Sequence, residues 1–176
     1  MPIIYRELDG TEIDRFREID RSELIEEVYH LREGLLVLEP ERYDMKGFPP
    51  GELEGLIARQ RAILASGGTV FGAFDDEALI GIASVEGHLR GGTGAYVNMD
   101  ALHVSASHRG RGVASNLVEL VAQRARAIGG KRLYISATES RHTVDFYRAR
   151  GATLATWIDP ELFAKEPRDI HLELAL

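Results

Sequence analysis

The sequence predicts a mixed α/β (α+β) fold with a single, mostly antiparallel sheet, one parallel βαβ pair and flanking helices. Three observations predict this class. Apolar, strand-like runs between Thr69 and Val104 are separated by short turns, which is typical of an antiparallel meander. A long amphipathic segment then joins two strand-like runs, and a helical crossover makes such strands parallel. The length of 176 residues fits one core, so residues 1–176 are expected to form a single domain.

The amino-terminal part predicts a strand, a helix and a hairpin. Residues 3–8 are typical of a short strand, and Thr11 with Asp14 resembles a capping box that opens a helix. The segment 26–39 alternates in polarity and breaks at Arg32-Glu33-Gly34, which indicates a hairpin.

The middle of the chain predicts a loop, a helix and the meander. Prolines bound a loop over residues 40–50, and a helix follows from Gly51 until Gly67-Gly68 end it. The three strands of the meander are then expected at Thr69 to Phe74, Leu79 to His88 and Tyr96 to Val104.

The carboxyl-terminal part predicts the crossover and the end of the sheet. A third helix follows Arg111 and stops at Gly129-Gly130. The remaining elements are a strand, a short helix and two strands, expected at 132–137, 141–150, 153–158 and 170–176. The apolar strands near this end are expected to be exposed and to allow a homodimer, because an exposed strand edge can pair with a second copy.

Composition narrows the class of protein. The net charge of −7 argues against nucleic-acid binding, because an acidic surface repels a phosphate polymer. No cysteine is present, which excludes disulfides and thiolate metal sites. The histidines lack metal-ligand spacing, so no metal is expected. His103 is interpreted as an outward-facing strand residue, His108 as a solvated loop residue, and His30, His88 and His171 as surface strand residues. Neither a membrane span nor a signal peptide is recognisable, so we expect a cytoplasmic protein.

The most informative stretch is the junction from Val104 to Ala114, which leads from a strand into the third helix. A helix amino terminus offers unpaired N–H groups and a partial positive charge to an anion. Gly110 and Gly112 keep this turn free of side chains, and Arg109 and Arg111 can supply charge to a phosphate. The stretch therefore predicts a phosphate-bearing ligand.

Two other kinds of phosphate loop fit poorly. A P-loop needs Gly-Lys followed by Ser or Thr, but no lysine follows Gly112 until Lys131. The dinucleotide fingerprint needs glycine or alanine at the position of Ser115 and an acidic residue about twenty positions later, where this chain has Lys131 and Arg132.

The junction resembles the signature of the GNAT superfamily of acyl-CoA N-acyltransferases, which reads Gln or Arg, two residues, Gly, one residue, then Gly or Ala. Here it is Arg109-Gly110-Arg111-Gly112-Val113-Ala114. A second piece, Asp145-Phe146-Tyr147 up to Gly151-Ala152, is similar to the family's short helix that carries an aromatic residue and a tyrosine. The order of elements agrees over nearly the whole chain.

The resemblance implies acetyl-CoA as cosubstrate. Backbone amides of the signature would cradle the pyrophosphate, the end of the preceding strand would bond the pantetheine arm, and Ser140 stands where the family often has Asn. The implied coenzyme contacts are Leu102, His103, Val104, Arg109, Gly110, Arg111, Gly112, Val113, Ala114, Ser140 and Tyr147.

Acyl transfer by direct attack needs a neutral amine, a polarised carbonyl and a proton for the thiolate. Asp100 is the first candidate for the base and Glu86 the second, although both also fit ordinary polar strand positions. Tyr147 is the candidate general acid, with core packing beside Phe146 as the alternative. A backbone N–H near Val104 would polarise the carbonyl.

The expected function is transfer of acetyl to a primary amine, either on a small molecule or on an exposed peptide. The acceptor would lie against the variable segment at about 26–50, where Tyr43, Asp44 and Phe48 suit a cationic, partly apolar group. The alternative is a non-catalytic acyl-CoA sensor or interaction module.

Overall fold

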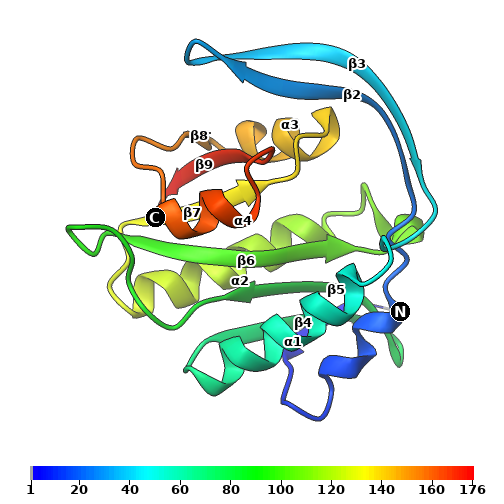
Figure 1. Ribbon diagram of the computed structural model, residues 1–176. Helices are drawn as coiled ribbons and strands as arrows, with labels where there is room; N and C mark the ends of the chain where they lie inside the picture. The colour runs from blue at the N-terminus through cyan, green and yellow to red at the C-terminus, as the bar shows by residue number, and fades with distance from the viewer. Residues whose placement is uncertain (1) are drawn as a thin grey trace.

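The computed structural model describes residues 2–176 and contains two sheets (Figure 1). Within those residues the main sheet has seven strands in the order β1-β4-β5-β6-β7-β9-β8, and β2 pairs with β3 apart from it. The strands are β1 (Ile4–Glu7), β2 (Glu23–Arg32), β3 (Leu35–Met45), β4 (Thr69–Asp75), β5 (Ala78–Val85), β6 (Tyr96–Val104), β7 (Arg132–Ala137), β8 (Thr153–Leu154) and β9 (Ile170–Ala175). Only β6 and β7 are parallel in the main sheet, so the predicted fold class is confirmed. Met1 lies outside the described residues.

Helices cover both faces of the main sheet. The α-helices are α1 (Glu52–Ala65), α2 (Val113–Ala127), α3 (Arg141–Ala149) and α4 (Pro160–Lys165), and the short 3₁₀ helices are η1 (Ile13–Glu18) and η2 (Ala106–His108). Helices α2 and α3 lie behind the sheet in Figure 1, whereas α1 and α4 lie in front of it. None of the described helices is long and apolar enough to cross a membrane.

The core is divided by the sheet, since successive strand side chains point to opposite faces. On the α2 face, Leu117 and Val121 of the helix pack with Val97 and Leu133 of the parallel strands. On the α1 face, buried side chains of the helix, η1 and the meander form a second cluster, which includes Phe16, Leu56, Ile57, Val70 and Ile82. Burial on both faces explains why β4 and β5 read as continuous apolar runs.

The parallel pair of β6 and β7 is short, and this matters for function. Pairing covers Tyr96–Met99 and Arg132–Ile135 only. The register of β6 against β5 shifts between Met99 and Ala101, so Asp100 is the extra residue of a β-bulge. Beyond the bulge the end of β6 is bonded only to β5, and the two parallel strands separate.

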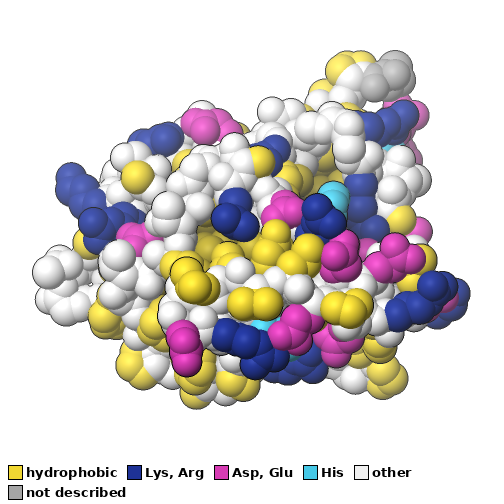
Figure 2. Space-filling model, turned by 90° about the horizontal axis from the view of Figure 1, so that it is seen from above, with side chains coloured by type: hydrophobic (Ala, Val, Ile, Leu, Met, Phe, Trp, Pro, Cys, Tyr) yellow, Lys and Arg dark blue, Asp and Glu magenta, His cyan; other side chains and the backbone are white. Residues whose placement is uncertain are grey.

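The β2/β3 hairpin arches over α3 as a separate arm (Figure 1). Its turn is Glu33-Gly34, which lies within the break predicted at Arg32-Glu33-Gly34, and both turn residues have positive φ. The prediction of a loop over 40–50 is partly wrong, because β3 continues through Pro40 to Met45. The pairing of β3 with β2 shifts register between Ile25 and Glu27 of β2. Figure 2, which looks onto the hairpin side, shows apolar side chains between scattered charges; Leu24, Leu31, Leu35 and Val37 are exposed on the arm.

Three further expectations are corrected. Thr11 does not cap η1, because its hydroxyl and amide bond Asp9, and η1 has no side-chain cap. The strand expected over 153–158 ends at Leu154, and α4, which the sequence analysis missed, begins after Asp159 caps it. The last strand is not an exposed edge, since β9 is largely buried and paired on both sides.

Candidate functional site

A cavity of about 350 Å³ opens where β6 ends, between the amino terminus of α2 and helix α3. Its walls include Leu102 and Val104 of β6, Gly110 and Gly112 of the turn, and Phe146 of α3. The sequence-predicted loop and strand end therefore line one cavity.

The turn before α2 leaves its backbone amides unpaired. Gly110 and Gly112 have φ of +73° and +81°, a conformation that favours glycine, and a Cβ at either would meet nothing within 4 Å. Within residues 2–176, no N–H from Gly110 to Ala114 donates to a protein acceptor. Several N–H groups and the positive end of a helix of 15 residues therefore face the cavity, which suits an anion.

Neither Arg109 nor Arg111 is placed as predicted, with a free guanidinium directed at a phosphate in the cavity. Arg109 donates its Nε to the Val104 carbonyl at 3.1 Å and its guanidinium to the Ser22 carbonyl at 2.7 Å, so it braces the turn. Burial lowers the pKa of Arg109. Arg111 is exposed and does not line the cavity. A cation that the sequence analysis missed, Arg150, which follows α3, lines the cavity, donates to the Ser115 hydroxyl and stacks 3.5 Å over the ring of Phe146.

The end of β6 offers a free backbone edge. The Ser105 N–H donates to the Ile80 carbonyl of β5, and along an antiparallel strand the backbone N–H groups point alternately toward and away from the partner strand. The N–H groups of Leu102 and Val104 therefore point away from β5 and into the gap beside β7. The Val104 carbonyl already accepts from Arg109, whereas its N–H remains available.

The predicted surroundings of the histidines are wrong at three positions. His103 is half-buried against Phe48, at 5.5 Å between ring centroids, and lines the cavity. Burial, and secondarily the charge of Arg21, lowers the pKa of His103 to about 3. His108 bonds Asp75 at 2.9 Å instead of facing solvent, and the expected surface residue His171 is buried against the Tyr134 hydroxyl at 2.7 Å.

A second cavity of about 320 Å³ lies on the α1 and α4 face. It shares residues with the first cavity at the separation of β6 and β7, among them Leu102, His103 and Tyr147. The two cavities therefore meet through the gap between the parallel strands. Carboxylates line the second cavity: Glu52, Asp100, Glu139, Glu166 and Asp169.

Tyr147 stands at this meeting point. Its side chain is 5% exposed, and its hydroxyl has no hydrogen-bond partner among residues 2–176. Burial raises the pKa of Tyr147 well above its usual value, so the phenol keeps its proton at neutral pH.

A sequence model of the acetyltransferase (GNAT) family matches residues 27–152, which is well over half of the chain. The chain belongs to the GNAT acetyltransferase family. No curated protein sequence matches it significantly.

Solved structures with the same fold as this GNAT chain include nourseothricin acetyltransferase, with a TM-score of 0.74 and 21% identity over 99% of each chain. A putative streptothricin acetyltransferase from Bacillus anthracis, in complex with acetyl coenzyme A, gives a TM-score of 0.73 and 18% identity over 100% of this chain and 99% of that one. PaiA N-acetyltransferase from Thermoplasma acidophilum, in complex with coenzyme A, gives 0.63 and 15% over 100% of both. At these identities the likeness establishes the fold.

The two carboxylates expected as bases in this GNAT chain are not brought together. Asp100 lines the second cavity, and its Oδ2 accepts from Arg59 at 2.7 Å and from Gln60 at 2.8 Å. Glu86 lies outside both cavities and is held by Arg90 through two hydrogen bonds.

Asp169, which the sequence analysis missed, faces the same cavity as Tyr147. Burial raises the pKa of Asp169 to about 6, and the charge of Glu166 acts in the same direction. Its Oδ2 accepts from the Ser136 hydroxyl at 2.8 Å. The only sequence signal for Asp169 was its place just before the last strand.

The remaining predicted positions have other surroundings. Ser140 is 2% exposed and caps α3 by accepting from the Thr143 amide, so its hydroxyl does not line the first cavity. Tyr43 is exposed, and Asp44 pairs with its neighbour Lys46 at 2.7 Å on the arm. Phe48 alone of the three expected acceptor residues reaches the site, through its contact with His103.

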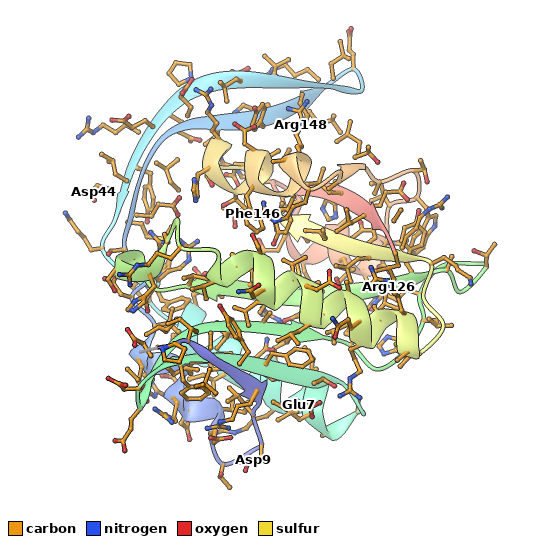
Figure 3. The ribbon with its side chains drawn as sticks, turned by 180° about the vertical axis from the view of Figure 1, so that it is seen from behind. Glu7, Asp9, Asp44, Arg126, Phe146 and Arg148 are labelled. Carbon is orange, nitrogen blue, oxygen red and sulfur yellow. The ribbon has the colours of Figure 1, made fainter. Side chains whose placement is uncertain are left out.

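Figure 3 shows how α3 divides its side chains between the site and the arm. Phe146 points from α3 toward α2, whereas Arg148 points toward the hairpin. Arg148 lies 5.9 Å from the ring centroid of Tyr29, whose hydroxyl donates to Asp145 at 2.6 Å. Helix α3 thus contributes one face to the cavity and uses the other to hold the arm.

Proposed function

We propose that this chain is an N-acetyltransferase that moves acetyl from acetyl-CoA to a primary amine by direct attack in a ternary complex. The observation that carries the proposal is the row of unpaired amides at Gly110 to Ala114, which opens onto a cavity that meets a second, carboxylate-lined cavity at Tyr147. Membership of the GNAT family supports it, as do the coenzyme complexes named among the similar structures.

The coenzyme would occupy the first cavity. The amides of the glycine turn suit its pyrophosphate, with Arg150 as an additional cation. The N–H groups of Leu102 and Val104 suit the amide groups of the pantetheine arm, which would lie along β6 as an added strand does. Arg109 contributes by bracing the turn.

The reaction would take place in the gap between β6 and β7. The amine nitrogen forms a bond to the acetyl carbon, the carbon–sulfur bond breaks, and Tyr147 donates a proton to the sulfur. Asp100 and Asp169 are the two carboxylates beside the gap that can take the proton of the ammonium form. Glu86 is less suited, because Arg90 holds both of its oxygens.

The acceptor would enter by the second cavity, on the side of the 26–50 segment where Met45 and the Phe48–His103 contact lie. Two of the similar structures are named for small molecules, nourseothricin and streptothricin. A small-molecule amine therefore fits the proposal, and an exposed peptide amine remains the second acceptor class that we propose.

Calorimetry with acetyl-CoA, followed by a thiol-release assay against a panel of amines, tests the proposal. We expect stoichiometric coenzyme binding and thiol release that depends on an added amine. Tight binding without amine-dependent release would instead indicate an acyl-CoA sensor. Absence of coenzyme binding would refute both functions.

A further inference from the structure

Three carboxylates of the second cavity have no cationic partner. Glu52 of α1, Glu166 after α4 and Asp169 before β9 make no ion pair within residues 2–176. The cations that line the same cavity are already engaged, since Arg59 pairs with Asp100, Arg21 with Glu23 and Lys165 with Glu161. The cavity therefore carries an excess of negative charge.

These carboxylates act on one another. Glu166, Glu139 and Glu52 each raise the pKa of Asp169, after the larger effect of burial. Partial desolvation of its carboxyl, followed by the charge of Glu52, also raises the pKa of Glu166. Like charges held near each other favour a bound cation, because it removes the repulsion.

The unpartnered Tyr147 is an independent sign that a ligand enters this cavity. The residue is only 5% exposed, and its hydroxyl has no partner among residues 2–176 although Tyr147 lines the cavity. It lies where the second cavity meets the first, on the same cavity as Asp169, whereas Glu52 and Glu166 are exposed at the rim. The cavity thus has a buried end and a negatively charged opening.

We propose that the acceptor is an organic molecule with at least two ammonium groups, one that reacts beside Tyr147 and Asp169 and one that Glu52 and Glu166 hold at the rim. This inference rests on the proposed transferase function. An attacking nitrogen must be neutral, so its own charge cannot balance the carboxylates at the opening. A second ammonium group keeps its positive charge throughout the reaction, so it can balance the charge of these carboxylates.

A point cation fits the site less well than an extended one. No group of three His, Asp or Glu side chains in the described part of the chain converges as a metal site. The carboxylates instead spread from α1 to the segment between α4 and β9. An extended diamine reaches both ends of such a cavity.

The transfer balances for a diamine as follows. The reacting ammonium gives one proton to a carboxylate, its nitrogen bonds the acetyl carbon, and the carbon–sulfur bond breaks. Of the two protons that the ammonium loses, one leaves through the carboxylate and one replaces the proton that Tyr147 donates to sulfur. The second ammonium is unchanged, so the product is a singly acetylated monocation.

The test compares diamines that have three to five carbons between nitrogens with monoamines of equal length, by thiol release at fixed acetyl-CoA. We expect the diamine kcat/KM to exceed that of the monoamine by at least about tenfold, and the ratio to fall at high salt. In the double variant Glu52→Gln/Glu166→Gln the ratio should fall toward one. The control Glu54→Gln lies on α1 outside the cavity and should keep the ratio.

The outcomes separate this inference from the proposed function. Acetyl transfer to both amines with equal kcat/KM, or a preference that survives the double variant, overturns the inference and leaves the transferase intact. Calorimetry of the diamine against the coenzyme A complex gives the second readout. Diamine binding that needs Glu52 and Glu166 but yields no thiol release supports the cation site and overturns the transferase. Binding of Mg²⁺ in place of the diamine would overturn the inference.

Discussion

At the scale of single residues, Tyr147 is a buried phenol that keeps its proton and has no protein partner. We expect Tyr147→Phe to lower kcat by about 100-fold, the lower end of what a general acid contributes. Coenzyme affinity and the free energy of unfolding should change little, because no hydrogen bond of the hydroxyl is lost. Stopped-flow thiol release and calorimetry measure the two quantities. Normal turnover across the pH range would remove Tyr147 as the acid.

Asp169 gives the second residue-scale prediction. Because the pKa of its carboxyl is raised to about 6, we expect the wild-type rate to fall as pH drops through 6. Asp169→Asn should slow the reaction and abolish that acid limb. If Asp100→Asn abolishes the limb and Asp169→Asn leaves it in place, Asp100 is the proton acceptor.

The same shift predicts a stability effect with a definite sign. The folded protein binds more protons than the unfolded chain between about pH 4 and 6, so Asp169 lowers wild-type stability as pH rises through that window. Relative to wild type, Asp169→Asn should therefore gain stability from pH 4 to pH 7, as measured by denaturant unfolding. A constant difference across that range would contradict the assignment.

Sequence reasoning found strand positions at this scale but not the partners of their side chains. The sequence predicts Asp100 as the first candidate base on the strand that leads to the phosphate turn, but its ion pair with Arg59 depends on how α1 packs on β6. Asp169 was missed because an acidic residue before a strand has no motif, and only the fold brings it to the cavity of Tyr147.

At the scale of elements, the glycine turn and α2 form the unit that we assign to the coenzyme. We expect Gly112→Asp to weaken acetyl-CoA binding by at least about tenfold, because like charges about 4 Å apart near a surface repel by roughly 4 kcal/mol. Gly129→Asp is the matched control. Gly129 also has positive φ, at +93°, and open space around it, but lies at the other end of α2.

Both variants should lose similar stability, about 1–2 kcal/mol from the forced left-handed backbone. Only Gly112→Asp should change the dissociation constant in calorimetry. Equal affinities in the two variants would place the pyrophosphate elsewhere.

Elements with strong periodicity were predictable, and those held by tertiary contacts were not. The meander, the crossover and the turn at Glu33-Gly34 follow from local pattern. The extension of β3 through Pro40 depends on a register shift that tolerates proline. Helix α4 has six residues, too few for a periodic signal, and depends on the Asp159 cap and on Leu162 packing against Tyr96 and Tyr134.

At the scale of the whole molecule, a buried ion network joins the end of β5 to α4. Arg90 bonds Glu86 and Asp159, and the exposed fractions of the three side chains are 10%, 12% and 6%. The hydrogen bonds of Glu86 raise the pKa of Arg90 further above its usual value. This network connects parts of the fold that are far apart in the sequence.

We expect Arg90→Met to destabilise the fold by about 3–5 kcal/mol, because it leaves the buried Asp159 and the largely buried Glu86 without their cation. Arg17→Met is the control, since Arg17 pairs with Glu54 at the surface, where such pairs contribute about 0–1 kcal/mol. Denaturant unfolding at neutral pH measures both. Equal losses would show that the network does not differ energetically from a surface pair.

The early end of the parallel pairing has a consequence for kinetics. Because β6 and β7 separate after Met99 and Ile135, the first and second cavities reach the same point from opposite faces of the sheet. If acetyl-CoA and the amine fill them, neither blocks the entrance of the other. Either can then arrive first, and double-reciprocal plots should intersect, with a dead-end coenzyme analogue competitive against acetyl-CoA and noncompetitive against the amine.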